Sequence, residues 1–314
     1  MKSYIGYSID STIRYKASSG GVGSAIVKYL LDNGQCDYAL SFEWDKLNLC
    51  YQPIFISDFS QYNICGSIYQ EINIIDCVKN FLNTCNRGDK IVLFCLPCQT
   101  RALRHICDRA GLDTIIIGLT CSSQQSKDAS LYLLNQIGIN ENDVVDLRYR
   151  GNGWPGGVSI TTNNGTHFFI KNNNSIWRDI FHSKLFIQHR CFMCNNTLNT
   201  YADISLADPW LKHYVENEKL GQTLFTSFTS KGEQLIQDCL NNNYINAIEV
   251  DSDLLYRSQI RTINRKEAYT THPNLTKRMR AVFLSDKYKR LAETPFLFKL
   301  HCLLLSKIEK MIIK

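Results

Sequence analysis

Apolar positions near the start of the chain change from a helical to a strand-like spacing. Between positions 22 and 30 they recur at intervals of three and four, which is typical of one helix face. Asn33-Gly34 then provides a helix stop, and the run 38–42 predicts a strand. The loop 17–21 before the helix is rich in Ser and Gly. Two interpretations fit it: a cradle of free N–H groups for a phosphate, or a glycine-rich cap without a ligand.

A second pattern predicts a β-α-β unit in the middle of the chain. Short apolar runs at 90–94 and 114–119 flank a helical pattern that ends at Gly111. Two strands joined in this way should be parallel, with a right-handed crossover. Cys98 and Cys121 each follow one of these strands. Because open α/β sheets bind ligands at the carboxyl ends of their parallel strands, the two thiols should face the same crevice.

The remaining patterns predict a mixed α/β protein whose last part is helical. They are a strand at 144–150, a hairpin of 158–162 and 167–171, a strand at 202–208, a helix at 231–240, and helical segments beyond Ile260 that are interrupted at Pro295. We therefore expect a parallel β-α-β core, a smaller N-terminal α/β domain and a helical C-terminal tail. The predicted boundaries are 1–86 for the N-terminal domain, 87–258 for the second domain and 259–314 for the tail.

Composition narrows the class of protein. The chain has 314 residues, of which 44% are hydrophobic and 20% charged, so it is long and apolar enough for a large core. This excludes a disordered or fibrous chain. No apolar run reaches the roughly 20 residues of a membrane helix, and the N-terminus lacks an apolar export segment, so we expect a cytoplasmic protein.

The positive charge of the chain is concentrated in the tail. The segment 277–314 holds ten Lys and Arg against three Asp and Glu, while the rest of the chain is close to neutral. A nucleic-acid partner is therefore not expected. The apolar, Lys-containing stretch 295–314 fits peripheral contact with an anionic membrane, docking on a partner, or packing on its own domain. We also expect a homo-oligomer.

Thirteen Cys in a chain of this class favour bound metal over a disulfide framework. Two C-x-x-C pairs, Cys95/Cys98 and Cys191/Cys194, have the spacing that is typical of a structural zinc site. A competing set replaces Cys95 with Cys121, because Cys121 follows its strand as Cys98 does. Four thiolates suit either zinc or an iron–sulfur cluster, and unligated buried thiols are a third interpretation.

Several short motifs together resemble the coenzyme F420 hydrogenase/dehydrogenase beta-subunit family. In the order of that family, they are Ala17 to Gly21, Gly66-Ser67-Ile68-Tyr69, Leu96-Pro97-Cys98-Gln99, Cys121, Arg148 to Trp154, Cys191 to Cys194, and Ala202-Asp203-Ile204 through Asp208 to Trp210. The segment 221–232 fits the closing part of the family pattern. The resemblance spans roughly residues 14–235.

The resemblance implies that the chain binds FAD and a 4Fe–4S cluster and acts as an oxidoreductase that transfers electrons between them and a small-molecule or sugar-linked substrate. It implies four cluster ligands, Cys98, Cys121, Cys191 and Cys194, and it discounts Cys95. It also places two segments near the flavin, and the residues concerned are Ser18, Ser19, Gly20, Gly21, Gly66, Ser67 and Tyr69. No catalytic residue is identified.

Other residues of these motifs have two interpretations each. Arg148 and Arg150 could bind a flavin phosphate or a substrate carboxylate, or could be ordinary surface residues of a strand. Trp154 could stack on the flavin ring or anchor its loop. Asp203 and Asp208 could act near the flavin, although a turn-capping role is the simpler interpretation for Asp208.

Two departures from the family pattern leave a second hypothesis open. Ser122-Ser123 stand where the family usually has His-Gly, and the C-x-x-C-x-x-C-x-x-x-C-P run of a ferredoxin-like domain does not occur. The first hypothesis therefore needs an external ferredoxin or redox partner subunit as electron donor. The second is a non-redox or metal-stabilised tailoring or assembly protein of a surface-polysaccharide pathway.

Overall fold

Strands from both ends of the chain form one eight-stranded sheet in the computed structural model, which describes residues 1–173 and 175–313. Its strands are β1 (Lys2–Ser8), β2 (Tyr38–Asp45), β3 (Cys50–Ile56), β4 (Lys90–Cys95), β5 (Asp113–Leu119), β9 (Ile204–Ala207), β10 (Thr223–Ser227) and β11 (Ile245–Val250). They lie in the order β11-β1-β10-β9-β5-β4-β2-β3. Strands of the predicted N-terminal and second domains thus share a sheet, and the domain division itself stays a prediction.

The centre of this sheet is parallel. Strand β4 pairs in parallel with β2 and β5, and β5 pairs in parallel with β9, while β1, β3, β10 and β11 are antiparallel to their neighbours. Helix α4 (Pro97–Ala110) connects β4 to β5. The predicted β-α-β unit is therefore confirmed, and the carboxyl ends of β4 and β5 lie at one edge of the sheet.

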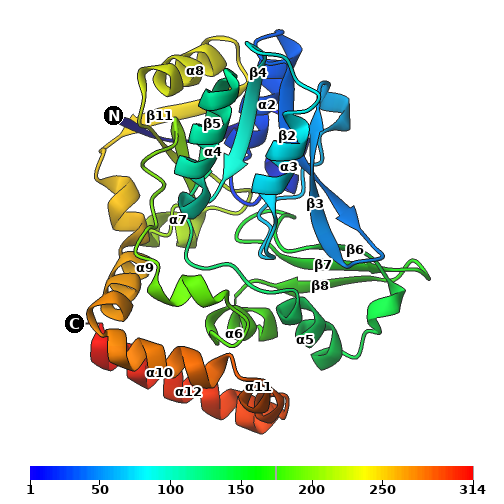
Figure 1. Cartoon of the computed structure of the whole chain (residues 1–314), viewed down its shortest axis with the longest axis vertical. Helices are drawn as coiled ribbons and strands as arrows, with labels where there is room; N and C mark the ends of the chain where they lie inside the picture. The colour runs from blue at the N-terminus through cyan, green and yellow to red at the C-terminus, as the bar shows by residue number, and fades with distance from the viewer. Residues whose placement is uncertain (174, 314) are drawn as a thin grey trace.

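Helices cover both faces of the large sheet (Figure 1). Helices α2 (Val22–Asp32) and α8 (Ser230–Asn241) pack on one face, and α3 (Ile74–Phe81) and α4 pack on the other. The apolar stripe of α2 is buried as its spacing predicts. Gly23 lets α2 pack closely on the sheet, because a Cβ at this position would lie 2.7 Å from the Leu206 side chain and 3.0 Å from the Phe94 ring.

A second, smaller sheet is antiparallel and consists of β6 (Val144–Arg148), β7 (Gly157–Thr162) and β8 (His167–Lys171). Strands β7 and β8 form the predicted hairpin. Short helices lie in the connections between strands: α1 (Ser11–Lys16), α5 (Asp128–Gln136), α6 (Ile176–His182) and α7 (Lys212–Asn217), with 3-10 turns η1 (Phe59–Gln61), η2 (Glu141–Asp143) and η3 (His189–Met193). The fold class predicted from the sequence is confirmed.

The tail is helical, as predicted. It consists of α9 (Leu254–Thr271), α10 (Pro273–Phe283), α11 (Asp286–Ala292) and α12 (Pro295–Ile312), and Lys314 lies outside the described residues. Pro295 is the first residue of α12, where its missing N–H leaves no helical hydrogen bond unmade. Pro273 begins α10 in the same way, and the sequence analysis did not predict that break.

The tail helices close a second hydrophobic core below the large sheet (Figure 1). Phe298, His301 and Leu305 of α12 are buried in that region, so one face of the helix packs on its own protein. The opposite face leaves Phe296 and Leu303 exposed. Membrane contact through that face stays a prediction. Within the described residues, every helix is too short or too polar to span a bilayer.

His301 makes the docking of α12 sensitive to pH. Its Nε2 donates to the carbonyl oxygen of Ser183 at 2.7 Å, and the Tyr288 hydroxyl lies 3.0 Å from its Nδ1. Burial lowers the pKa of His301 below its ordinary value of 6.5, against the opposing effect of the Ser183 carbonyl. The folded protein therefore resists a proton that the unfolded chain accepts.

We expect the free energy of unfolding to fall as the pH drops below about 6.5, by up to about 1.4 kcal/mol per pH unit from this residue. The loss continues until the pH reaches the lowered pKa of the folded state. Urea denaturation at a series of pH values should show a shallower decline in His301→Phe than in the wild type. His105→Gln, at an exposed position, is the control. Equal slopes in wild type and His301→Phe would contradict the prediction.

Candidate functional site

Four cysteines from three separate parts of the chain line one small pocket at the carboxyl edge of the parallel strands. Cys98 is the second residue of α4 and Cys121 follows β5, while Cys191 lies in η3 and Cys194 directly after it. Their thiols are free. The structure thus brings together the set of cysteines that the resemblance implies.

Cys95 does not line that pocket. It is the last residue of β4, is 1% exposed in the hydrophobic core, and its Sγ lies 3.2 Å from Oγ1 of Thr100. The alternation of side chains along the strand explains this placement. Within residues 1–173 and 175–313, no group of three or more His, Cys, Asp or Glu is gathered as the binding site of a single metal ion.

Positive side chains accompany the thiols. Lys266 of α9 and Arg190 of η3 line the same pocket, together with Ser122 and Ser123. Burial raises the pKa of the Cys121 thiol to about 12, while Lys266 acts in the opposite direction. Because a metal binds the thiolate form, metal binding at Cys121 would release the proton that burial favours.

A second group of predicted residues meets beside this pocket. The Ser18 Oγ accepts a short hydrogen bond from the backbone N–H of Ser67, so the 18–21 loop touches the 66–69 segment. Gly66 makes that contact possible, because it has φ +71° and a Cβ there would lie 3.0 Å from the Ser18 oxygen. Two motifs that are far apart in sequence therefore form one surface.

A buried ion pair holds this surface together. Arg150 is 2% exposed and donates to both carboxylate oxygens of Asp208 at 3.1 Å. It also donates to the Tyr69 hydroxyl at 3.0 Å and to the Ser18 carbonyl oxygen at 2.6 Å. The Trp154 indole N–H donates to the same Asp208 carboxylate at 2.7 Å. Arg150 is thus neither a surface residue nor a free anion-binding group, and Asp208 is more than a turn cap.

The rest of the 18–21 loop is bound to β10 and leads directly into the first turn of α2. The backbone N–H of Gly20 donates to Thr223 Oγ1 at 2.9 Å, and the Ser19 hydroxyl lies 3.0 Å from the same oxygen. Gly21 has φ +77° and precedes α2 without a side-chain cap. The first N–H groups of α2 therefore have no capping side chain, which fits the phosphate cradle proposed from the sequence.

Arg148 and Trp154 are placed by backbone and ring contacts. Arg148 donates to the carbonyl oxygen of Lys16 at 2.9 Å and, in a shorter bond, to that of Ile64. Its Nε is buried and has no partner among the described residues, as is also true of the Arg150 Nε. Trp154 is 4% exposed and packs on Trp210, with ring centroids 5.2 Å apart. Trp154 thus anchors its loop in this structure.

The segment after Cys121 joins the cysteine pocket to the second group. Gln124 lines the pocket, and its side-chain amide donates to the carbonyl oxygen of Gln70. The backbone N–H of Gln125 donates to the Tyr69 carbonyl oxygen at 3.3 Å. The segment that follows Cys121 therefore contacts both the cysteine pocket and the chain at Tyr69–Gln70.

Two further residues near this site have no motif that identifies them in the sequence. Lys266 and Gln259 lie on α9, and Gln259 donates to the Asp208 carbonyl oxygen at 3.0 Å. The sequence gives little indication of their role, because both residues occur in a polar helix at the start of the basic tail, where polar side chains are normally solvent-exposed. Asp203 is buried and accepts from Arg104 at 2.7 Å and from the backbone N–H of Ile116 at 2.8 Å, so its carboxylate is held by β5 and α4.

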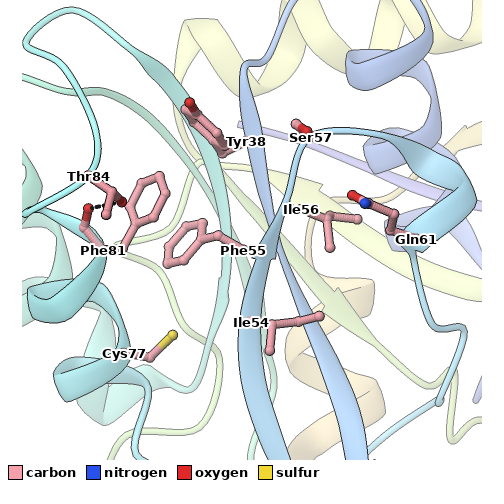
Figure 2. Close-up of a pocket in the computed structure, with 9 residues that line it drawn as sticks. All are labelled: Tyr38, Ile54, Phe55, Ile56, Ser57, Gln61, Cys77, Phe81 and Thr84. Atoms are coloured by element: carbon pink, nitrogen blue, oxygen red, sulfur yellow. Dashed lines mark hydrogen bonds between the residues drawn. The ribbon is translucent and has the colours of Figure 1, made fainter.

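A larger pocket lies elsewhere, between the edge strand β3 and α3, and has a volume of about 500 Å³ (Figure 2). Its walls are mostly apolar, and Figure 2 shows Phe55 and Phe81 side by side in them, with a centroid distance of 3.8 Å. It contains none of the predicted site residues. Size alone does not make it the functional site, because it lacks a group of converging polar or titratable side chains.

Two family models match the chain. Residues 3–78 match the N-terminal model of the family described as coenzyme F420 hydrogenase/dehydrogenase, beta subunit. Residues 88–253 match the model for the C terminus of the same family. Together these segments cover more than half of the chain, including the four cysteines of the pocket and the Arg150–Asp208 pair.

Individual relatives agree with this match. The F420-dependent formate dehydrogenase 1 subunit beta of Methanococcus maripaludis is 25% identical over 243 residues, which are 75% of this chain and 58% of the relative. The chain therefore spans less than two thirds of the length of that relative. A chain in the F420-reducing NiFe hydrogenase complex from Methanosarcina barkeri has the same fold, with a TM-score of 0.64 and 17% identity over 85% of this chain and 90% of that one.

Proposed function

The chain belongs to the coenzyme F420 hydrogenase/dehydrogenase beta subunit family, and on that premise we propose that it is an iron–sulfur flavoprotein subunit of an oxidoreductase. Members of this family are known to bind FAD and iron–sulfur clusters. In the proposed role the chain passes electrons between a 4Fe–4S cluster, FAD and a small-molecule substrate. The flavin would supply the hydride chemistry, while the protein sets its orientation and potential.

The observation that carries the proposal is the shared pocket of Cys98, Cys121, Cys191 and Cys194. The donor chemistry fits an iron–sulfur cluster, since four thiolates are the usual ligand set and each binds a different iron of a 4Fe–4S cluster. The four sulfurs must therefore surround one pocket, but they need not meet at a single metal ion. A zinc site built on Cys95 has no support in the placement of that side chain in the core.

The flavin would lie against the surface formed by Ser18, Gly66, Ser67 and Tyr69. Three observations support this: the uncapped start of α2 behind Gly21, the buried Nε of Arg148 without a partner among the described residues, and the hydrogen bond from Gln124 of the cysteine pocket to Gln70, the residue after Tyr69. Arg150, Asp208 and Trp154 would position that surface. We assign no proton-transfer role to any of them.

Electrons would come from a partner. The relatives named above are a formate dehydrogenase subunit and a chain of a hydrogenase complex, so we propose that this chain also works beside a redox partner subunit or an external ferredoxin. The sugar-linked substrate and the surface-polysaccharide role predicted from the sequence have no support in these relatives and stay predictions. So do the homo-oligomer and the place of the protein in the cell.

Anaerobic purification tests the proposal. We expect yellow-brown protein with a flavin band near about 450 nm, a broad sulfur-to-iron absorbance, and iron and acid-labile sulfide in equal amounts. Acid extraction followed by chromatography identifies the flavin as FAD or another form. Colourless protein with stoichiometric zinc would contradict the proposal and favour the metal-stabilised, non-redox alternative.

A further inference from the structure

Lys266 brings a buried side chain to the cysteine pocket from outside both matched family segments. It lies on α9, beyond residue 253 where the second match ends. The residue is 4% exposed, and it lines the pocket with Cys98, Cys121, Cys191 and Cys194. The tail therefore completes a wall of the proposed cluster site, which the basic composition of the tail did not predict.

The Lys266 ammonium is held by the two loops that carry the cysteines. Its Nζ donates to the carbonyl oxygen of Cys121 at 2.8 Å and, in a shorter bond, to that of Asn196. It also lies 3.7 Å from the Sγ of Cys194. These contacts fix the position of the ammonium relative to the thiols. One oxygen belongs to Cys121 itself, and the other belongs to Asn196, two residues after Cys194.

Across residues 1–173 and 175–313, no carboxylate forms an ion pair with this ammonium. The ion pairs found among the described residues do not include Lys266. A buried ammonium with no counter-charge is costly, because water no longer solvates it. The groups beside it that can carry negative charge are the pocket thiols. Thiolates that ligate a cluster would supply the missing negative charge next to Lys266.

We infer that Lys266 is a positioning residue that balances the negative charge of the thiolate-ligated cluster and raises its reduction potential. This inference rests on the proposed function. One-electron reduction, with the electron supplied by the redox partner, adds one negative charge to the pocket and requires no proton. A fixed ammonium at the Cys194 sulfur favours that added charge, as hydrogen bonds and charges near cluster sulfurs generally do.

Three variants of the full-length, anaerobically purified protein test the inference. Lys266→Gln keeps N–H donors for the backbone oxygens but removes the charge, and Lys266→Arg keeps the charge. Lys277→Gln removes a charge from an exposed position of the tail and is the matched control. Iron content, and the midpoint potential from a redox titration followed by electron paramagnetic resonance, are measured for each.

We expect Lys266→Gln to lower the ratio of reduced to oxidised cluster about tenfold at a fixed potential, a midpoint shift of about 59 mV for one electron. Lys266→Arg and Lys277→Gln should remain near the wild type. Loss of iron in Lys266→Gln but not in Lys266→Arg would also support the inference, because charge would then be needed to retain the cluster.

Two outcomes overturn the inference. Equal potentials in wild type and Lys266→Gln, or equal loss of iron in Lys266→Gln and Lys266→Arg, would show that the charge has no role. These results leave the proposed function intact, since the wild type still holds its cluster. Wild-type protein without iron overturns the inference and the proposed function together.

Discussion

Replacing Asp208 with Ala is expected to destabilise the protein by about 3–5 kcal/mol, because it leaves a buried guanidinium without its counter-charge. The side chain of Arg150 is 1% exposed and that of Asp208 16% exposed. Burial lowers the pKa of Arg150, but the charges and hydrogen bonds of Asp208 and Tyr69 together outweigh that effect, so the net pKa is raised. Arginine stays protonated in proteins even when it is buried, so the guanidinium keeps its charge in the variant. The Trp154 N–H loses its acceptor as well.

Urea denaturation of the apo and cofactor-loaded protein measures this effect. The pair Lys2–Glu249 provides a matched control, since it has the same N···O distance of 3.1 Å but its side chains are 50% and 55% exposed. Glu249→Ala should cost less than about 1 kcal/mol. In an Arg150→Met background, Asp208→Ala should cost much less than in the wild type, because the uncompensated charge is gone. Similar losses for Asp208→Ala and Glu249→Ala would contradict the prediction.

The same variant affects the proposed flavin surface. Arg150 joins Ser18, Tyr69 and Asp208, which belong to three of the motifs on which the family resemblance rests. We expect Asp208→Ala to lose flavin before it loses the secondary structure of the sheet. The ion pair thus links the stability of the fold to the geometry of the site.

The sequence predicted the parts of this fold that depend on local patterns. The apolar runs of β4 and β5 and the helix between them predicted a parallel pair, and this pairing places Cys98 and Cys121 at one sheet edge. The turn at Asn163-Asn164-Gly165 likewise identified the β7–β8 hairpin. In each case the residues that decide the structure lie within one short stretch.

Contacts between distant segments were not predictable in the same way. Strand β1 pairs with β10 and β11, more than 200 residues further along the chain, and no local pattern in these short strands specifies their partners. The motif residues Arg150 and Asp208 were identified, but their mutual contact was not. Their separate interpretations as a surface Arg and a turn cap missed the ion pair, because burial depends on the packing of loops.

Lys266 shows that amino-acid composition alone does not reveal which polar residues of a helix are buried. The helix α9 turns Ser258, Gln259 and Lys266 inward, whereas inward positions of a helix are normally apolar. A polar residue at such a position looks solvent-exposed in sequence. Only the fold shows that this stripe faces the cysteine pocket and Asp208 instead of water.

Cys121→Ser is expected to remove almost all bound iron, whereas Cys95→Ser should retain the wild-type amount. Cys121 lines the pocket with the other three thiols, and a serine oxygen is a poor ligand for an iron–sulfur cluster. Cys95 lies in the core beneath the sheet, where its replacement costs packing but leaves the four ligands unchanged. The comparison decides between the two cysteine sets that the spacing of the motifs left open.

Iron, sulfide and zinc analysis of both variants, together with their visible spectra, gives the result. Cys239→Ser is a suitable control for the general cost of changing a buried thiol, since Cys239 is fully buried in α8 on the other face of the sheet. Its iron content should match that of Cys95→Ser. If Cys95→Ser loses its metal and Cys121→Ser keeps it, the ligand set is the pair of C-x-x-C motifs, and the cluster proposal fails with it. The arrangement of thiols at the carboxyl ends of β4 and β5 makes the opposite result the expected one, because Cys95 would have to leave the core to reach the pocket.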